Sequence, residues 1–214
     1  MSDALSPNIV ITGFMGTGKS AVGRRLATQT GRTFVDLDAE IIAKHGSIAD
    51  LFAEGGEERF RTVEREMVAE FSPKRNQVIA TGGGTMLDPD NVVAFLGAEV
   101  FALTASPEEI EKRVIADGIE GRPLLANADD VSETIATMLA GRSEAYEKFT
   151  TVDTTNRSID EVIEALRDAG ADIPLANQEA DTQESSKRAD KALIVVVVIF
   201  AVIALALLVL VLSF

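Results

Sequence analysis

Residues 13–20 read Gly13-Phe14-Met15-Gly16-Thr17-Gly18-Lys19-Ser20, directly after an apolar run at 8–12 and before a segment with helical periodicity. This is the pattern G-x-x-x-x-G-K-[ST] between a predicted strand and a predicted helix, which is typical of a loop that binds nucleotide phosphates. The glycines let backbone N–H groups approach the phosphates, the lysine reaches the β- and γ-phosphates, and the serine hydroxyl can ligate Mg²⁺. The alternative interpretation is a glycine-rich turn before an ordinary helix.

The chain outside this loop alternates between short apolar runs and helical patterns. We expect strands at 8–12, 33–38, 78–81, 99–103 and 151–154. Between and after them we expect helices at 19–29, 39–44, 47–55, 57–71, 107–117, 129–149 and 159–169, together with one that begins near Pro89. Gly141 is a candidate interruption of the helical segment 129–149. Such alternation predicts an α/β fold with a parallel sheet covered by helices on both faces.

Carboxylates and glycines follow two of the predicted strands. If the strand at 33–38 stays extended to its end, Asp36 and Asp38 project to the same side, at the sheet edge where α/β proteins bind ligands. The alternative is that one of them caps the next helix. The glycines 82–84 follow the strand at 78–81, where close approach of the backbone to a ligand is the favoured interpretation over a plain turn.

The helical segment 57–71 and the loop 119–124 carry the arginines whose roles the pattern leaves open. Glu57, Glu58, Glu64 and Arg65 are most simply a solvated helix face, and Arg59 cannot be separated from Arg61 by spacing. Arg122 stands in a loop with glycine and proline, so it is either a lid arginine for phosphoryl transfer or part of a surface loop.

Composition excludes several classes of function. The chain has 214 residues, a formal net charge of −14 and no cysteine. The missing thiols exclude disulfides and thiolate chemistry. Without a basic stripe the chain lacks the usual signature of nucleic-acid binding, so the phosphate loop is expected to serve a small-molecule reaction.

A 21-residue apolar run at 192–212 has no charge, glycine or proline. At 1.5 Å per residue this length spans a hydrocarbon core of about 30 Å, so we expect a transmembrane helix, the alternative being an unusually apolar packing helix. Lys187, Arg188 and Lys191 precede the run, which places the preceding domain on the cytoplasmic side. The expected domains are a flexible 1–7, a globular 8–170, a polar linker 171–191 and the membrane segment 192–214.

Together these motifs resemble shikimate kinase, a small P-loop kinase of the aromatic amino-acid pathway. The resemblance covers about residues 8–169. Besides the phosphate loop it is carried by Phe34-Val35-Asp36-Leu37-Asp38, Ser47-Ile48-Ala49-Asp50-Leu51-Phe52, Phe60-Arg61-Thr62-Val63-Glu64, Gly82-Gly83-Gly84, Gly121-Arg122-Pro123-Leu124-Leu125 and Arg142. It implies a P-loop NTPase three-layer α/β/α sandwich with a five-stranded parallel sheet. It also implies a monomeric enzyme that moves the γ-phosphoryl group of Mg·ATP to the 3-hydroxyl of shikimate.

The resemblance also implies a role for each matching residue on the acceptor side. Asp38 would bind the shikimate hydroxyls and orient or deprotonate the attacking one. Arg61 and Arg142 would hold the shikimate carboxylate, and the backbone of Gly82, Gly83 and Gly84 would contact the same substrate. Arg59 then becomes a bystander.

On the nucleotide side the resemblance assigns ATP to residues of the phosphate loop and to a few arginines. Gly13, Gly16, Thr17, Gly18, Lys19 and Ser20 would bind the phosphates, and Asp36 would lie near Mg²⁺, through water, beside Ser20. Arg122 would be the lid residue that, with Lys19, stabilises charge on the transferred group. Arg113 and Arg157 match the adenine-binding positions only approximately.

Two other functions share parts of this pattern. A gluconate kinase-like enzyme would keep the loop and lid but would not be expected to carry the set Asp38, Arg61, Gly82–Gly84 and Arg142. A non-catalytic, membrane-tethered nucleotide-binding module would be favoured by loss of Lys19, Asp38 or Arg122, and all three are present. The apolar segment lies outside the resemblance.

Overall fold

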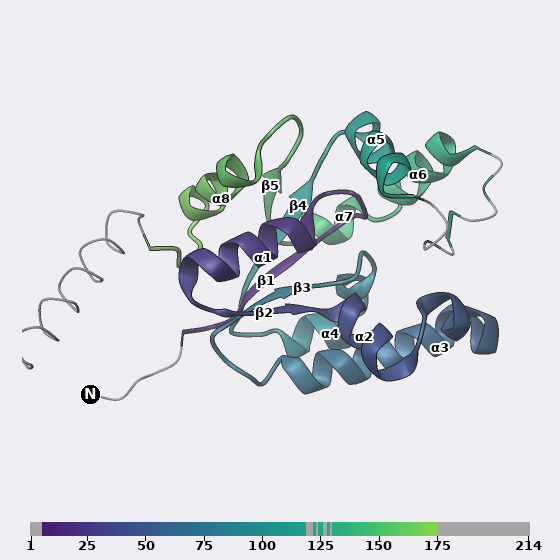
Figure 1. Cartoon of the computed structure of the whole chain (residues 1–214), viewed down its shortest axis with the longest axis horizontal. Helices are drawn as coiled ribbons and strands as arrows, with labels where there is room; N and C mark the ends of the chain where they lie inside the picture. The colour runs from purple at the N-terminus through teal and green to yellow at the C-terminus, as the bar shows by residue number, and fades with distance from the viewer. Residues whose placement is uncertain (1–5, 119–121, 123, 126–127, 129, 175–214) are drawn as a thin grey trace, which may run out of the picture. The chain divides into compact units, whose positions relative to one another are not determined.

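A five-stranded parallel sheet organises the described residues, in the order β2-β3-β1-β4-β5 (Figure 1). The computed structural model describes residues 6–118, 122, 124–125, 128 and 130–174. The strands are β1 (Ile9–Gly13), β2 (Thr33–Asp36), β3 (Gln77–Ala80), β4 (Glu99–Thr104) and β5 (Thr150–Asp153). The parallel five-stranded sheet is as predicted, with β1 at its centre, so the loop that follows β1 lies in the middle of the carboxyl edge.

Helices cover both faces of the sheet and give three layers. They are α1 (Lys19–Thr30), α2 (Leu37–His45), α3 (Ile48–Phe71), α4 (Pro89–Ala94), α5 (Pro107–Asp117), α6 (Val131–Ala140), α7 (Ser143–Tyr146) and α8 (Ile159–Asp168), with a 3-10 turn η1 (Thr85–Leu87). Figure 1 shows α1 and α8 on one face and α2, α3 and α4 on the other. Alternate β1 residues divide accordingly, because Ile9 and Ile11 pack with α1 and α8 whereas Val10 packs with α2 and α3.

Local capping chemistry sets most helix ends where the sequence predicts them. Gly31 adopts the left-handed conformation that ends α1, and Ser106 accepts the N–H of Glu109 at the start of α5. Ser158 and Glu161 form a reciprocal capping box at α8. The predicted break at residues 55–56 is also present, as non-helical backbone inside α3.

The extended conformation predicted for residues 33–38 is wrong at its end. β2 stops at Asp36, whose side chain accepts the Ala39 N–H at 3.3 Å and caps α2 from Leu37 onward. Asp36 is therefore the helix cap that the alternative interpretation allowed. Asp38 lies in the first turn of α2, and both carboxylates are close enough to Lys19 to raise its pKa.

The packed unit extends slightly beyond the predicted domain end at residue 170. Ala171 and Ile173 are buried in the core cluster that contains α8, so they belong to the compact unit, which ends at Ile173. The polar segment consequently begins after Ile173 rather than at 171. Among the described residues no helix is long and apolar enough to cross a membrane. The predicted span at 192–212 lies outside those residues.

Candidate active site

Three adjoining cavities lie along the carboxyl edge of the sheet. The first is lined from α2, α3, the glycine segment after β3 and Arg142, which immediately precedes α7. The second is lined from the phosphate loop, α1 and α5. The third lies between α1, Arg113 of α5 and the start of α8. Each cavity shares lining residues with the next, so the three form one continuous site.

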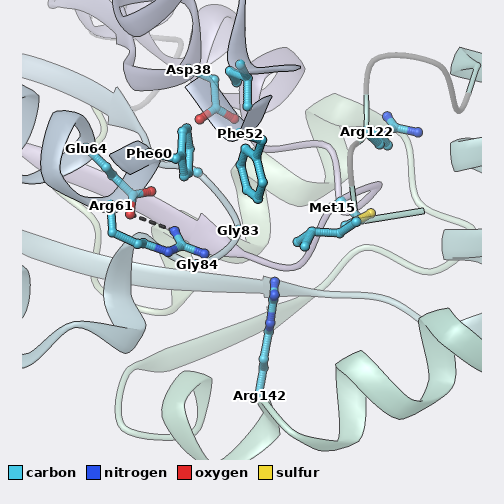
Figure 2. A pocket seen from close by; sticks show the side chains of 13 residues that line it. Met15, Asp38, Phe52, Phe60, Arg61, Glu64, Gly83, Gly84, Arg122 and Arg142 are labelled. Atoms are coloured by element: carbon cyan, nitrogen blue, oxygen red, sulfur yellow. Dashed lines mark hydrogen bonds and ion pairs between the residues drawn. The ribbon is translucent and has the colours of Figure 1, made fainter. Parts of the chain in front are cut away.

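The first cavity, of about 210 Å³, combines an apolar wall with three cations and two carboxylates. Its lining residues are Met15, Asp38, Ile48, Phe52, Phe60, Arg61, Glu64, Gly82, Gly83, Gly84, Arg122, Leu124 and Arg142. Figure 2 shows Arg61 and Arg142 pointing toward the same space, Arg61 from α3 and Arg142 from the turn between α6 and α7. An arginine pair that converges on a small, partly aromatic cavity suits a compact organic anion.

The second cavity surrounds the phosphate loop. Gly16 and Gly18 have φ of 76° and 89°, a conformation that a side chain would strain. Gly13 has no room for one either, because a Cβ atom there would lie 2.2 Å from the Leu103 carbonyl oxygen. The Lys19 ammonium donates to the Phe14 carbonyl oxygen at 2.9 Å, folded back over the loop. Burial lowers the pKa of Lys19 to about 8, against the neighbouring carboxylates of Asp38 and Asp36, which raise it.

The first two cavities share Met15, Asp38, Gly83 and Arg122. Asp38 therefore faces both the anion-binding cavity and the phosphate loop. Burial raises the pKa of Asp38 to about 6, with Lys19 opposing that rise and Asp36 adding to it. A carboxylate with a pKa near neutrality, between a small-molecule cavity and a phosphate site, suits general-base chemistry.

A polar network fixes the α3 side of the first cavity. Glu64 is almost completely buried and accepts from Arg61 Nη1 at 2.7 Å and from the Thr85 hydroxyl at 2.6 Å. Although burial lowers the pKa of Arg61, the carboxylates of Glu64 and Glu57 raise it above its ordinary value. A Cβ atom on Gly82 would lie 2.9 Å from both Asp38 Oδ1 and Glu64 Oε1. Glycine at 82 thus allows these two carboxylates to approach the backbone.

The third cavity contains Arg157 at its rim and Arg113 at its junction with the second. Arg113 is already engaged, because it donates to the carbonyl oxygens of Gly16 (3.2 Å) and Thr154 (2.8 Å). It braces the phosphate loop against the segment after β5.

The family model described as shikimate kinase matches residues 15–169. The chain belongs to the shikimate kinase family. The shikimate kinase of Pelotomaculum thermopropionicum is 44% identical over 162 residues, which cover 74% of this chain and 92% of the relative. That of Thermus thermophilus is 43% identical over 161 residues, covering 74% and 86%.

Solved structures agree with this membership of the shikimate kinase family. The shikimate kinase of Acinetobacter baumannii, solved in complex with shikimate, superposes with a TM-score of 0.70 at 33% identity, covering 76% of this chain and 92% of that one. The enzyme of Bacteroides thetaiotaomicron gives a TM-score of 0.68 at 28% identity, covering 76% and 97%.

The structure brings together the residues that the shikimate kinase resemblance assigns to the acceptor, since Asp38, Arg61, Arg142 and the glycines 82–84 line one cavity. Arg122 lines both that cavity and the phosphate cavity, while its guanidinium donates to the Val114 and Gly118 carbonyl oxygens at 3.0 and 3.2 Å. Arg59 is exposed.

The donor set at the phosphate loop fits Mg²⁺ of a nucleotide complex. Ser20 lines the second cavity, and Asp36 lies near enough to Lys19 to raise the pKa of that lysine. The Ser20 hydroxyl and the Asp36 carboxylate are both hard oxygen donors, the kind that Mg²⁺ prefers. Within the described residues there is no group of three or more His, Cys, Asp or Glu side chains able to hold a metal alone.

Two residues of the site escaped the sequence analysis. Glu64, expected on a solvated face, is buried, and its position among Phe60, Val63, Met67 and Val68 in the apolar stripe was the available signal. Tyr146 is also buried, and its hydroxyl donates to the Gly83 carbonyl oxygen. Its signal was weaker, a lone tyrosine one helical turn after Arg142.

Proposed function

We propose that this chain transfers the γ-phosphoryl group of ATP to the 3-hydroxyl of shikimate. The observation that carries the proposal is the position of Asp38, a carboxylate of pKa about 6 in the wall that the acceptor-sized cavity shares with the phosphate cavity. An acceptor hydroxyl beside Asp38 would lie next to the phosphates bound by the loop. Family membership and the shikimate complex of the Acinetobacter baumannii enzyme support the choice of acceptor.

On the acceptor side, Arg61 and Arg142 would bind the carboxylate of shikimate by charge-assisted hydrogen bonds. The ring would lie against Phe52 and Phe60, whose centroids are 5.3 Å apart on one side of the cavity. The backbone of the glycines 82–84 would approach the substrate without side chains in between. These contacts would leave the ring hydroxyls facing Asp38.

On the nucleotide side, the backbone N–H groups of residues 13–20 would surround the β- and γ-phosphates. The hydroxyl of Ser20 and, through water, Asp36 would hold Mg²⁺, which neutralises charge on those phosphates. Lys19 would exchange its bond to the Phe14 carbonyl oxygen for phosphate oxygens, and Arg122 would stabilise charge on the transferred group. Arg157 would lie toward the base, in the third cavity.

In the chemical step, the 3-hydroxyl oxygen of shikimate would form a bond to the γ-phosphorus as the bond from that phosphorus to the β–γ bridging oxygen breaks. The hydroxyl proton would pass to Asp38. Because the folded pKa of Asp38 is about 6, the carboxylate is mostly ionised at pH 7 yet basic enough to accept a hydrogen bond from the hydroxyl and then its proton.

The test is ADP release by the full chain with Mg·ATP and shikimate, compared with gluconate, quinate and no acceptor. Release is expected only with shikimate and should collapse in Asp38→Asn and Arg61→Ala. Equal release with gluconate would instead favour a different small-molecule kinase. Binding of ATP without acceptor-dependent release would favour a nucleotide-binding module.

We also propose that residues 192–212 cross a membrane and tether the kinase to its cytoplasmic face. The support is the sequence itself, 21 consecutive apolar residues preceded by Lys187, Arg188 and Lys191. A kinase that acts as a monomer is likewise a proposal, made from membership of the shikimate kinase family.

Fractionation of cells that make the full chain tests the tether. Kinase activity is expected in the membrane pellet after an alkaline wash, and Ile203→Arg, which places a charge within the run, should release it. Wild-type activity in the soluble fraction would contradict the tether while leaving the kinase proposal intact.

A further inference from the structure

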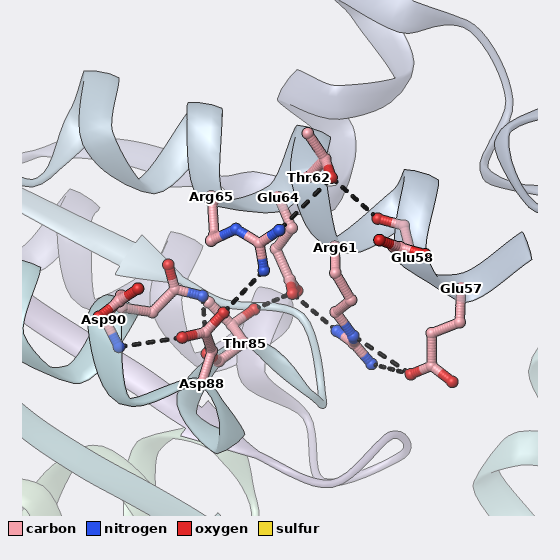
Figure 3. A network of polar contacts seen from close by, with 10 residues as sticks. Glu57, Glu58, Arg61, Thr62, Glu64, Arg65, Thr85, Asp88 and Asp90 are labelled. Carbon is pink, nitrogen blue, oxygen red and sulfur yellow. Dashed lines mark hydrogen bonds and ion pairs between the residues drawn. The ribbon is translucent and has the colours of Figure 1, made fainter. Parts of the chain in front are cut away.

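The guanidinium of Arg61 is held between two carboxylates of its own helix (Figure 3). Glu57, one turn earlier, accepts through a single oxygen, Oε1, from Nη2 at 2.8 Å and from Nε at 3.2 Å. Glu64 accepts from Nη1 at 2.7 Å on the other side. The two partners thus occupy different edges of one planar group.

The remaining hydrogen-bonding capacity of Arg61 follows from counting its N–H groups. A guanidinium carries five, of which Nε has one and each terminal nitrogen has two. Glu57 takes the Nε–H and one N–H of Nη2, and Glu64 takes one N–H of Nη1. One N–H on each terminal nitrogen is left. The edge between Nη1 and Nη2, called the end-on edge here, can pair with the two oxygens of a carboxylate.

The end-on edge of Arg61 faces the empty side of Gly84. A Cβ atom on Gly84 would lie 2.3 Å from Nη2, 2.6 Å from Nη1 and 2.7 Å from Cζ. Both nitrogens are closer to that point than the carbon is, so the edge between them points at it. Since Gly84 and Arg61 both line the first cavity, the missing side chain leaves the open edge available to a ligand there.

The two glutamates fix this orientation from different environments. Glu64 has a side chain that is 1% exposed and is itself held by the Thr85 hydroxyl, so it fixes where Nη1 lies. A single ion pair leaves a planar group free to turn about it, even with its Cζ 5.2 Å from the centroid of the Phe60 ring. Glu57, 52% exposed and not part of the cavity wall, supplies the second contact that stops the swing.

We propose that Glu57 is a positioning residue for acceptor binding: it turns the open edge of Arg61 toward the space beside Gly84, where the acceptor carboxylate binds. The inference rests on the proposed function, because that function supplies a carboxylate ligand for Arg61. It adds a residue that neither touches the substrate nor lines the cavity, yet sets the affinity for the carboxylate.

The experiment measures initial rates of the full chain in detergent micelles with shikimate and Mg·ATP, each varied in turn. Glu57→Ala removes the acceptor oxygen, Glu57→Gln keeps an oxygen that can still accept from Nε and Nη2, and Glu58→Ala is the matched control. Glu58 is the next residue and is also exposed, and its backbone carbonyl accepts from Thr62 at 3.0 Å. Unfolding midpoints of all variants show whether the fold is retained.

Glu57→Ala is expected to raise the KM for shikimate about fivefold, the range of an exposed ion pair that orients its partner, with kcat and the KM for ATP within about twofold. Glu57→Gln should recover most of that loss, and Glu58→Ala should leave all three constants unchanged. An unchanged KM in Glu57→Ala, or no recovery in Glu57→Gln, would overturn the positioning role. A lower KM would overturn it too, by showing that Glu57 competes with the acceptor.

These outcomes are distinct from failure of the proposed function. If the unaltered chain gives no shikimate-dependent ADP release, both the function and the inference fail. If the unaltered chain turns over normally and Glu57→Ala matches it, only the inference fails.

Discussion

Asp38→Asn is expected to stabilise the fold while it removes turnover. The folded pKa of Asp38, about 6, lies above its ordinary value of 3.8. A carboxyl group that holds its proton more tightly when folded contributes stability that is fully present below pH 3.8 and is lost as the pH rises through 6. At pH 7 the folded chain therefore bears the whole cost of an ionised, largely desolvated Asp38, and the neutral amide does not.

The size of the effect follows from the shift in pKa. A rise from 3.8 to about 6 is about 2 units, which corresponds to about 3 kcal/mol at most. The attraction between Asp38 and buried Lys19 is already included in this shift, because it opposes the rise in the pKa of Asp38. We expect a gain of up to about 3 kcal/mol, which is about 6 to 12 °C in unfolding midpoint for a domain of this size.

The assay is thermal unfolding of residues 1–173, which form the compact unit, at a series of pH values from 4 to 8. The difference between Asp38→Asn and the unaltered chain should be small at pH 4 and grow as the pH approaches 7. Asp168→Asn, an exposed carboxylate at the end of α8, controls for the change in net charge. A variant less stable than the parent, or a difference that does not change with pH, would refute the reasoning.

Three further predictions concern the site and the ends of the packed unit. In the pH profile of kcat/KM for ATP, activity should fall below about pH 6 as Asp38 gains a proton and above about pH 8 as Lys19 loses one. A kcat/KM that does not change with pH over that range would contradict these two assignments. Gly84→Ala places a methyl group against the end-on edge of Arg61. It should therefore raise the KM for shikimate at least about tenfold and leave the KM for ATP unchanged. Equal changes in both KM values would argue against a local effect. Arg32, whose side chain is 3% exposed, donates to the Pro7 carbonyl oxygen and to Asp172. Arg32→Ala should therefore lower the free energy of unfolding by about 2 kcal/mol in denaturant titration, while turnover per folded molecule is retained. Unchanged stability would show that these contacts do not hold the two ends of the packed unit together.

Elements whose signals are local could be predicted closely from the sequence. The phosphate loop, the glycine stop of α1 at Gly31 and the capping box at Ser158 each depend on residues within one turn, and each occurs as predicted. The parallel sheet followed because strands and helices alternate along the chain. For the site residues, the motifs indicated chemistry, but only the structure shows that Asp38, Arg61 and Arg142 line one cavity.

The errors arose where a local pattern permits two outcomes and tertiary contacts choose between them. Residues 33–38 can continue as a strand or turn into a helix, and the cap provided by Asp36 favours the helix from Leu37. Glu64 is a charged residue of the kind expected on a solvated helix face. It is nevertheless buried next to Gly82, because Arg61 and Thr85 donate hydrogen bonds to its carboxylate there. Ala171 and Ile173 pack against the core although the segment after them is polar.

Phosphoryl transfer to shikimate can be followed directly by ³¹P NMR of the full chain with Mg·ATP and shikimate. We expect the γ-phosphate signal of ATP to be replaced by that of a phosphomonoester on the 3-hydroxyl of shikimate. We also expect Asp38→Asn to bind both substrates but to give no ester. ADP and free inorganic phosphate formed at the same rate with and without shikimate would contradict this transfer.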